Sequence, residues 1–77
     1  MKINILYFAS LREAIGKPND ILDVDSSLTA SQAWELSTHN AVRPSNTLIA
    51  INQEYVDAET LLNDGDELAF FPPVTGG

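Results

Sequence analysis

The sequence predicts a small α+β domain in which one principal helix packs across a mixed sheet of four to five strands. Three observations predict it. Short apolar segments of strand length lie near both ends of the chain, a longer segment with helical spacing lies between them, and turn-forming residues separate these segments. The chain has 77 residues, 44% of them hydrophobic, which suits one compact domain and leaves no room for an active-site cleft between domains.

The first third of the chain predicts a strand, a short helix and a second strand. Residues 2–8 are rich in bulky apolar side chains and too few for a helix. Residues 10–13, Ser-Leu-Arg-Glu, match a capping box that would begin a helix of little more than one turn, ended by Gly16 and Pro18. Residues 20–25 alternate apolar and acidic side chains, and we expect this strand to pair antiparallel with the first.

The middle of the chain predicts the principal helix. Thr29 and Gln32 form a second capping box, from which a helix is expected to run to about Asn40. Its apolar face would carry residues at helical spacing: Ala30, Ala33, Trp34 and Ser37. We therefore expect Trp34 to fill the core.

The last third predicts the remaining strands. Residues 48–51 are apolar, residues 52–54 form a polar turn, and residues 55–56 return from it. A turn at 63–66 precedes the final strand at 67–71. Two strands, a crossing helix and then two or three strands describe a ubiquitin-like β-grasp roll, over residues 1–71, with an extended tail over residues 72–77.

Charge and composition exclude several functions. Four basic and 11 acidic residues give a net charge of −7, which disfavours nucleic acid and anionic membranes and favours a basic protein surface as partner. Cysteine is absent, so disulfides and thiolate metal sites are excluded. No stretch is apolar and long enough to span a membrane, and Asn4 and Arg12 interrupt any leader-like run, so we expect a cytoplasmic protein.

The polar residues predict no catalytic site, no metal site and no bound cofactor. Residues 64–67, Asp-Gly-Asp-Glu, lack the register of a calcium loop and are typical of a turn in which Gly65 supplies a positive φ. His39 is the only histidine and is expected near the end of the principal helix, where a cation suits the helix dipole. No glycine-rich loop precedes a helix, so any nucleotide is expected to be bound by a partner.

The tail is the candidate functional segment. Pro72 and Pro73 fix φ and lack amide donors, so the chain leaves the last strand stiffly extended, and six residues reach roughly 20 Å. Gly76 and Gly77 carry no side chains and could enter a narrow channel. A bare carboxylate is a poor electrophile, but adenylation by ATP would activate it for attack by sulfur, giving a thiocarboxylate, or by an amine, giving an isopeptide. An ordinary frayed terminus is the structural alternative.

Strand parity predicts the partner surface. Side chains alternate between the two faces of a strand, so if Asn4 faces solvent, Leu6 and Phe8 lie on the same outer face. If Glu67 faces solvent in the final strand, Phe71 lies on that face too. Tyr55 follows the turn at 52–54 and is expected to join them. The outer face of the sheet would then present Leu6, Phe8, Tyr55 and Phe71 as interface anchors.

Residues 64–77, with support from residues 7–9 and 11–13, resemble the small subunits of molybdopterin synthase (MoaD type), and the Phe-Pro-Pro-Val-Thr-Gly-Gly ending carries most of this likeness. The resemblance implies that an E1-like adenylyltransferase, using ATP, activates Gly77, and that a sulfur donor system converts it to a thiocarboxylate. It further implies that the tail inserts into the large synthase subunit through Pro72, Pro73, Val74, Thr75 and Gly76.

In that family the large subunit holds the catalytic lysines and the substrate, cyclic pyranopterin monophosphate, so this chain would be no enzyme by itself. The complex implied is a heterotetramer in which two copies flank a dimer of large subunits. Three alternatives stay open: the thiazole-forming sulfur carrier of thiamine synthesis, whose relatives are generally shorter and lack the Pro-Pro, a ubiquitin-like protein modifier, and an interaction domain with a frayed tail.

Overall fold

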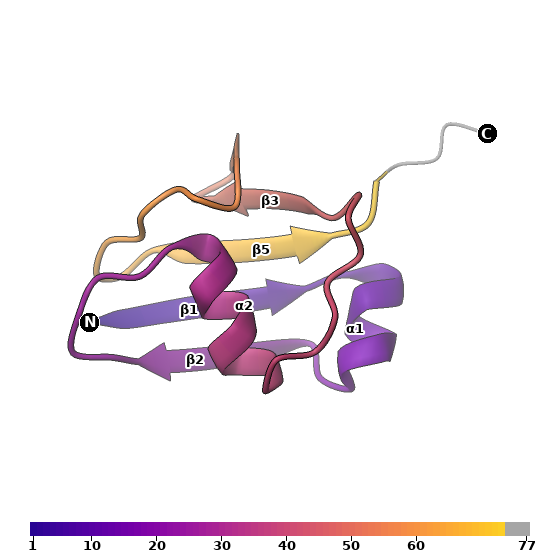
Figure 1. Cartoon of the computed structure of the whole chain (residues 1–77), viewed down its shortest axis with the longest axis horizontal. Coiled ribbons are helices and arrows are strands. Elements are labelled where there is room, and N and C mark those ends of the chain that lie inside the picture. The colour runs from indigo at the N-terminus through magenta and orange to yellow at the C-terminus, as the bar shows by residue number, and fades with distance from the viewer. Residues whose placement is uncertain (74–77) are drawn as a thin grey trace.

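A mixed sheet of five strands and two helices forms the domain, in a computed structural model that describes residues 1–73 (Figure 1). The strand order is β2-β1-β5-β3-β4, with β1 and β5 parallel at the centre and the other pairs antiparallel. The α+β prediction and the mixed sheet are confirmed. The elements are β1 (Lys2–Tyr7), α1 (Ala9–Ile15), β2 (Asn19–Asp23), α2 (Ala30–Thr38), β3 (Leu48–Ile51), β4 (Glu54–Val56) and β5 (Glu67–Phe71).

The predicted capping box at Ser10 is wrong. Helix α1 begins at Ala9, directly after β1, and its N-cap is Phe8, which offers no side-chain cap. The Phe8 carbonyl already accepts hydrogen bonds from the amides of Leu11 and Arg12, so Ser10 lies inside the first turn, where its hydroxyl cannot cap. The helix has seven residues, longer than predicted, and ends as expected at Gly16, whose φ is 88°.

The second capping box is confirmed. The Thr29 hydroxyl accepts a hydrogen bond from the Gln32 amide, and the Gln32 side chain accepts one from the Thr29 amide. Helix α2 ends at Thr38, two residues before the predicted end, because His39 adopts the left-handed conformation at φ 56°. His39 is therefore the C-cap residue, and its amide donates to the carbonyl of Glu35.

Two turns in the second half shape the sheet. Asn52 and Gln53 both have positive φ values, 51° and 72°, as a type I′ hairpin requires. The hairpin turn is therefore complete at Gln53, and Glu54 belongs to β4 rather than to the predicted turn at 52–54. Gly65 has a φ of 85°, which confirms its predicted role in the turn before β5.

An aromatic cluster forms the centre of the core between α2 and the sheet. Trp34 is 2% exposed, which confirms it as a core residue. Its ring meets Phe70 edge to face at 5.0 Å between centroids, and Tyr7 at 5.9 Å. Tyr7 in turn stacks on Phe70 at 5.9 Å, so the ends of β1 and β5 are packed together under the helix. Within residues 1–73, no helix is long and apolar enough to cross a membrane.

A chain of hydrogen bonds ties this core to the edge strand β2. The Tyr7 hydroxyl donates to Ser37 Oγ at 2.5 Å, Ser37 Oγ donates to Asp20 Oδ2 at 2.8 Å, and Lys17 Nζ donates to the same oxygen at 2.8 Å. Burial raises the pKa of Tyr7. Partial burial also acts to raise the pKa of Asp20, but hydrogen bonds from Lys17, Ser37 and the Ile21 amide outweigh it, so this pKa lies below its ordinary value.

The lowered pKa of Asp20 makes stability depend on pH. Because the carboxylate is favoured in the folded state, its contribution is present above the unfolded pKa, near pH 4, and is lost as pH falls through the lower folded pKa. We expect Asp20→Asn to lower the free energy of unfolding at neutral pH and to flatten its decline below about pH 4. Urea unfolding across a pH series measures both, with Asp25→Asn, at an exposed position, as the matched control. An Asp20→Asn profile parallel to the wild type would contradict this assignment.

Candidate functional site

The candidate site is the face of the sheet that α2 does not cover. Pairing between strands places residues of one parity in rows across this face. In the central row Tyr55 lies opposite Ala50, Ala50 opposite Ala69, and Ala69 opposite Leu6. In the next row Leu48 lies opposite Phe71. The inward-facing neighbours are buried, Ile5 and Tyr7 on β1 and Leu68 and Phe70 on β5, so the predicted parity of both strands is confirmed.

Three aromatic rings gather at the tail end of this face. The Phe8 and Phe71 rings meet nearly at right angles with centroids 6.1 Å apart, and the Tyr55 and Phe71 rings lie 5.6 Å apart. Phe8 is 46% exposed and Tyr55 is 70% exposed. Phe8 extends the ladder beyond β1, because its amide donates to the Phe70 carbonyl. We call Leu6, Phe8, Tyr55 and Phe71 the outer patch. Parity predicts three of them, Leu6, Phe8 and Phe71, and Tyr55 is the residue expected to join them; the structure brings all four together.

A shallow hollow of about 280 Å³ lies within the outer patch. Its floor is formed by the paired residues Ala50 and Ala69, and Glu67 and Gln53 add polar groups to its lining. Ala50, Leu48 and Gln53 also lie on this face and are not among the residues predicted for it. The alternation of residues 48–51 could have shown two of them, but Gln53 reaches the hollow only because of the hairpin turn.

The base of the tail lies beside the outer patch. Pro72 and Pro73 follow Phe71 directly and are half-buried. With Ser10 and Leu11 of α1 and with the loop before β3, they line a second hollow of about 440 Å³. Sequence reasoning missed this hollow, since it depends on the path of the loop at residues 44–47. The predictions for Val74, Thr75, Gly76 and Gly77 lie outside the described residues.

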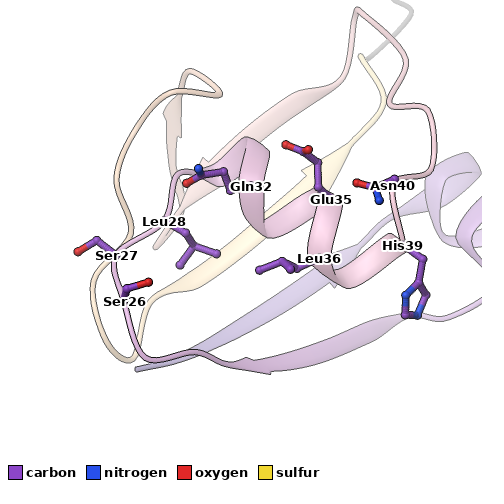
Figure 2. A pocket seen from close by; sticks show the side chains of 8 residues that line it. All are labelled: Ser26, Ser27, Leu28, Gln32, Glu35, Leu36, His39 and Asn40. Carbon is purple, nitrogen blue, oxygen red and sulfur yellow. The ribbon is translucent and has the colours of Figure 1, made fainter.

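A third hollow, of about 550 Å³, lies beside α2 (Figure 2). Its lining residues, between 26 and 40, are distant in sequence from the tail. Figure 2 shows that the Glu35 and His39 side chains point to different sides of the helix, while Ser26 and Ser27 lie on the preceding loop. These polar groups do not converge on one point, so nothing here positions a nucleophile, a general base or a ligand. Within residues 1–73, no three His, Asp or Glu side chains stand close enough together to hold a metal ion.

The crossing helix, the mixed sheet with a parallel central pair, and the exposed outer face define a ubiquitin-like β-grasp protein. Comparison with known sequences makes this more specific. The chain belongs to the ThiS family, whose sequence model matches residues 5–77.

Similar proteins share nearly the whole length of the chain. The molybdopterin synthase sulfur carrier subunit of Haemophilus influenzae is 36% identical, with 97% of this chain and 99% of that protein aligned. SAMP1 from Haloferax volcanii has a crystal structure that matches over 100% of both chains with a TM-score of 0.78 and 26% identity. A chain from the complex of subunits 1 and 2 of the Helicobacter pylori molybdopterin-converting factor also matches over 100% of both chains, with a TM-score of 0.70; at 22% identity this likeness concerns the fold alone.

Proposed function

We propose that this chain is the sulfur carrier subunit of molybdopterin synthase and takes part in the biosynthesis of the molybdenum cofactor. The observation that carries the proposal is the 36% identity, over almost the full length, to a protein of that name. The position of the outer patch beside the base of the tail supports it, because a carrier must present its reactive end and its docking surface to the same partner.

The reactive group in this proposal is the carboxylate of Gly77. It attacks the α-phosphorus of ATP in an E1-like adenylyltransferase, which releases pyrophosphate and leaves an acyl adenylate. A sulfur nucleophile at the oxidation level of sulfide, delivered by a donor system, then displaces AMP and leaves the terminal thiocarboxylate. ATP is bound by the activating enzyme, and this chain needs no cofactor of its own. Because ATP and both partner enzymes must be at hand, the cytoplasm suits the reaction.

The large synthase subunit is the proposed partner for delivery of the sulfur. The tail, residues 72–77, enters that subunit, and the outer patch docks beside the entrance. In this proposal the chain contributes its thiocarboxylate to the transfer, and the groups that catalyse the transfer belong to the large subunit. The net charge of −7 favours a basic surface around the entrance, since opposite charges speed the encounter.

A second candidate function is covalent modification of other proteins. The similarity to SAMP1, whose whole chain superposes on this one, favours this alternative. The first step, adenylation of Gly77, would be the same, but an amine would then take the place of sulfur and leave an isopeptide bond. The thiazole-forming sulfur carrier differs from the main proposal only in where its sulfur goes.

Replacing Phe71 by Ala should weaken binding to the large subunit by more than ~1 kcal/mol, about fivefold or more in Kd, because the ring contacts both Phe8 and Tyr55 at the centre of the outer patch. Titration calorimetry measures the affinity, and thermal unfolding should show little loss of stability. Leu36→Ala, which removes an exposed apolar side chain from α2, is the matched control and should bind as the wild type does. Equal affinities for all three proteins would remove the outer patch from the interface.

Deleting Gly77 should abolish sulfur loading without unfolding the domain. The deletion shortens the tail by roughly 3.5 Å, and a misplacement of about 1 Å can already cost a hundredfold in rate. Adding a residue after Gly77 should be equally damaging, because the reactive carboxylate becomes an amide. Purified variants are incubated with ATP, the activating enzyme and a sulfur source and then weighed intact by mass spectrometry. Normal sulfur loading of the shortened chain would rule out the carrier mechanism, and isopeptide products would favour the modifier.

The complex with the large subunit should be a heterotetramer of two small and two large chains, while the isolated chain should be monomeric or only weakly associated. This expectation rests on the resemblance to molybdopterin synthase. Light scattering coupled to size-exclusion chromatography gives the masses directly. A heterodimer of one small and one large chain would contradict it.

A further inference from the structure

The hollow in the outer patch, which we call the socket, is small. Its floor is made of two alanines, Ala50 and Ala69, which lie opposite each other on neighbouring strands. Larger side chains border this floor along the same row, because Tyr55 lies opposite Ala50 and Leu6 lies opposite Ala69. The volume of about 280 Å³ is below the ~300 Å³ at which pockets for small-molecule ligands begin.

The two ends of this socket differ in chemistry. Along β5, outward-facing residues recur every two positions, about 7 Å apart, so Phe71 stands at one end of the floor and Glu67 at the other. The Phe71 end is aromatic. At the opposite end the Glu67 carboxylate and the Gln53 side chain both offer oxygen acceptors.

The backbone of Glu67 is held firmly in place. Its amide donates to Asn52 Oδ1 at 3.0 Å, and its carbonyl accepts from the Asn52 amide at 2.8 Å. Asn52 is itself fixed by a hydrogen bond from its Nδ2 to Asp66 Oδ1 at 2.9 Å. Within residues 1–73 the ion pairs are Met1–Asp23 and Lys17–Asp20, and neither uses the Glu67 carboxylate. The exposed Glu67 side chain therefore projects from a fixed backbone at the end of an apolar socket, and neither of these ion pairs occupies its carboxylate.

We propose that this socket receives an arginine side chain of the large synthase subunit. The aliphatic stem would lie on Ala50 and Ala69, the guanidinium would reach the carboxylate of Glu67, and the ring of Tyr55 would flank it. The proposal rests on the function proposed above and adds to it the chemistry that the partner must present at this point.

Arginine fits this site better than the other candidates. An aliphatic side chain would bury the Glu67 carboxylate without a partner, which is costly. Lysine would satisfy the charge as a compact cation. The planar guanidinium of arginine can donate to two acceptor groups at once and also stack on an aromatic face, and arginine is enriched among the residues that dominate binding energy. The excess of acidic over basic residues in this chain is complementary to such a partner.

The first test removes the charge at the end of the socket. We expect Glu67→Gln to weaken binding to the large subunit at least tenfold in titration calorimetry, because breaking one half of a buried charge pair is far more costly than losing an exposed charge. Glu59→Gln, at an exposed position outside the hollow, makes the same change in net charge and should bind within about twofold of the wild type. Ala69→Leu, which fills the floor, should also weaken binding, while circular dichroism checks that each variant is folded.

The second test identifies the partner's side chain. The large subunit is treated with an arginine-selective dicarbonyl reagent, alone and in complex with wild-type chain or with Glu67→Gln, and peptide mass spectrometry locates the modified residues. One arginine should be protected by the wild-type chain and less protected by the variant. Glu67→Arg in this chain, and replacement of the protected arginine by glutamate in the large subunit, should each weaken binding. Combining the two changes should restore part of the lost affinity.

The outcomes separate the two proposals. A wild-type chain that does not bind the large subunit would overturn the proposed function and this inference together. If the wild type binds tightly but Glu67→Gln and Glu59→Gln bind with equal affinity, only the socket proposal is overturned. The same holds if no arginine of the large subunit is protected. Protection of a lysine in place of an arginine, detected with an amine-selective reagent, would also overturn it as stated.

Discussion

The parallel pairing of β1 with β5 is the interaction on which the rest of the structure depends. It joins the two ends of the chain at the centre of the sheet, with Ile5 opposite Leu68 and Tyr7 opposite Phe70. All four of these side chains are buried and belong to the core under α2. The same register sets the opposite face, because the neighbours of these residues point outward. Phe8 and Phe71 therefore meet beside the base of the tail as a direct result of how the core is paired.

The two capping boxes show how far local sequence patterns can be trusted. Both Ser10 and Thr29 are followed three residues later by a side chain that could complete the motif, yet only Thr29 caps a helix. The difference is tertiary. Thr29 is held in an extended conformation by an antiparallel bridge with Leu61, directly before the first turn of α2, which is where an N-cap must stand. Phe8 is held in the same way by its hydrogen bond to β5, so the first turn of α1 begins from Phe8 and Ser10 falls inside it. Local chemistry alone does not contain that information.

Much of the fold and of the outer patch could be predicted for a simple reason. Side chains along β1 and β5 alternate between the buried face and the outer face of the sheet, and burial of one face fixes this alternation strongly. The amino-acid sequence alone was therefore enough to assign Phe8 and Phe71 to the outer face. The hollow at Ala50 and Ala69 could not be predicted in this way, because it depends on which strands are neighbours and in what register. The tail prediction rests on the chemistry of Gly77 and on family resemblance, and is tested by experiment alone.

The place of β5 in the sheet also bears on how the protein is made. β5 lies at the centre of the sheet, where it pairs with β1 on one edge and with β3 on the other, and it is the last strand of residues 1–73. A ribosome must therefore synthesise residues 67–71 before the sheet can close, and chains that stop earlier lack the strand that joins β1 to β3. Only a chain that extends through β5 can therefore complete the sheet. Chains truncated before residue 67 would lack this pairing, so we expect them to be more open to proteolysis than the folded domain.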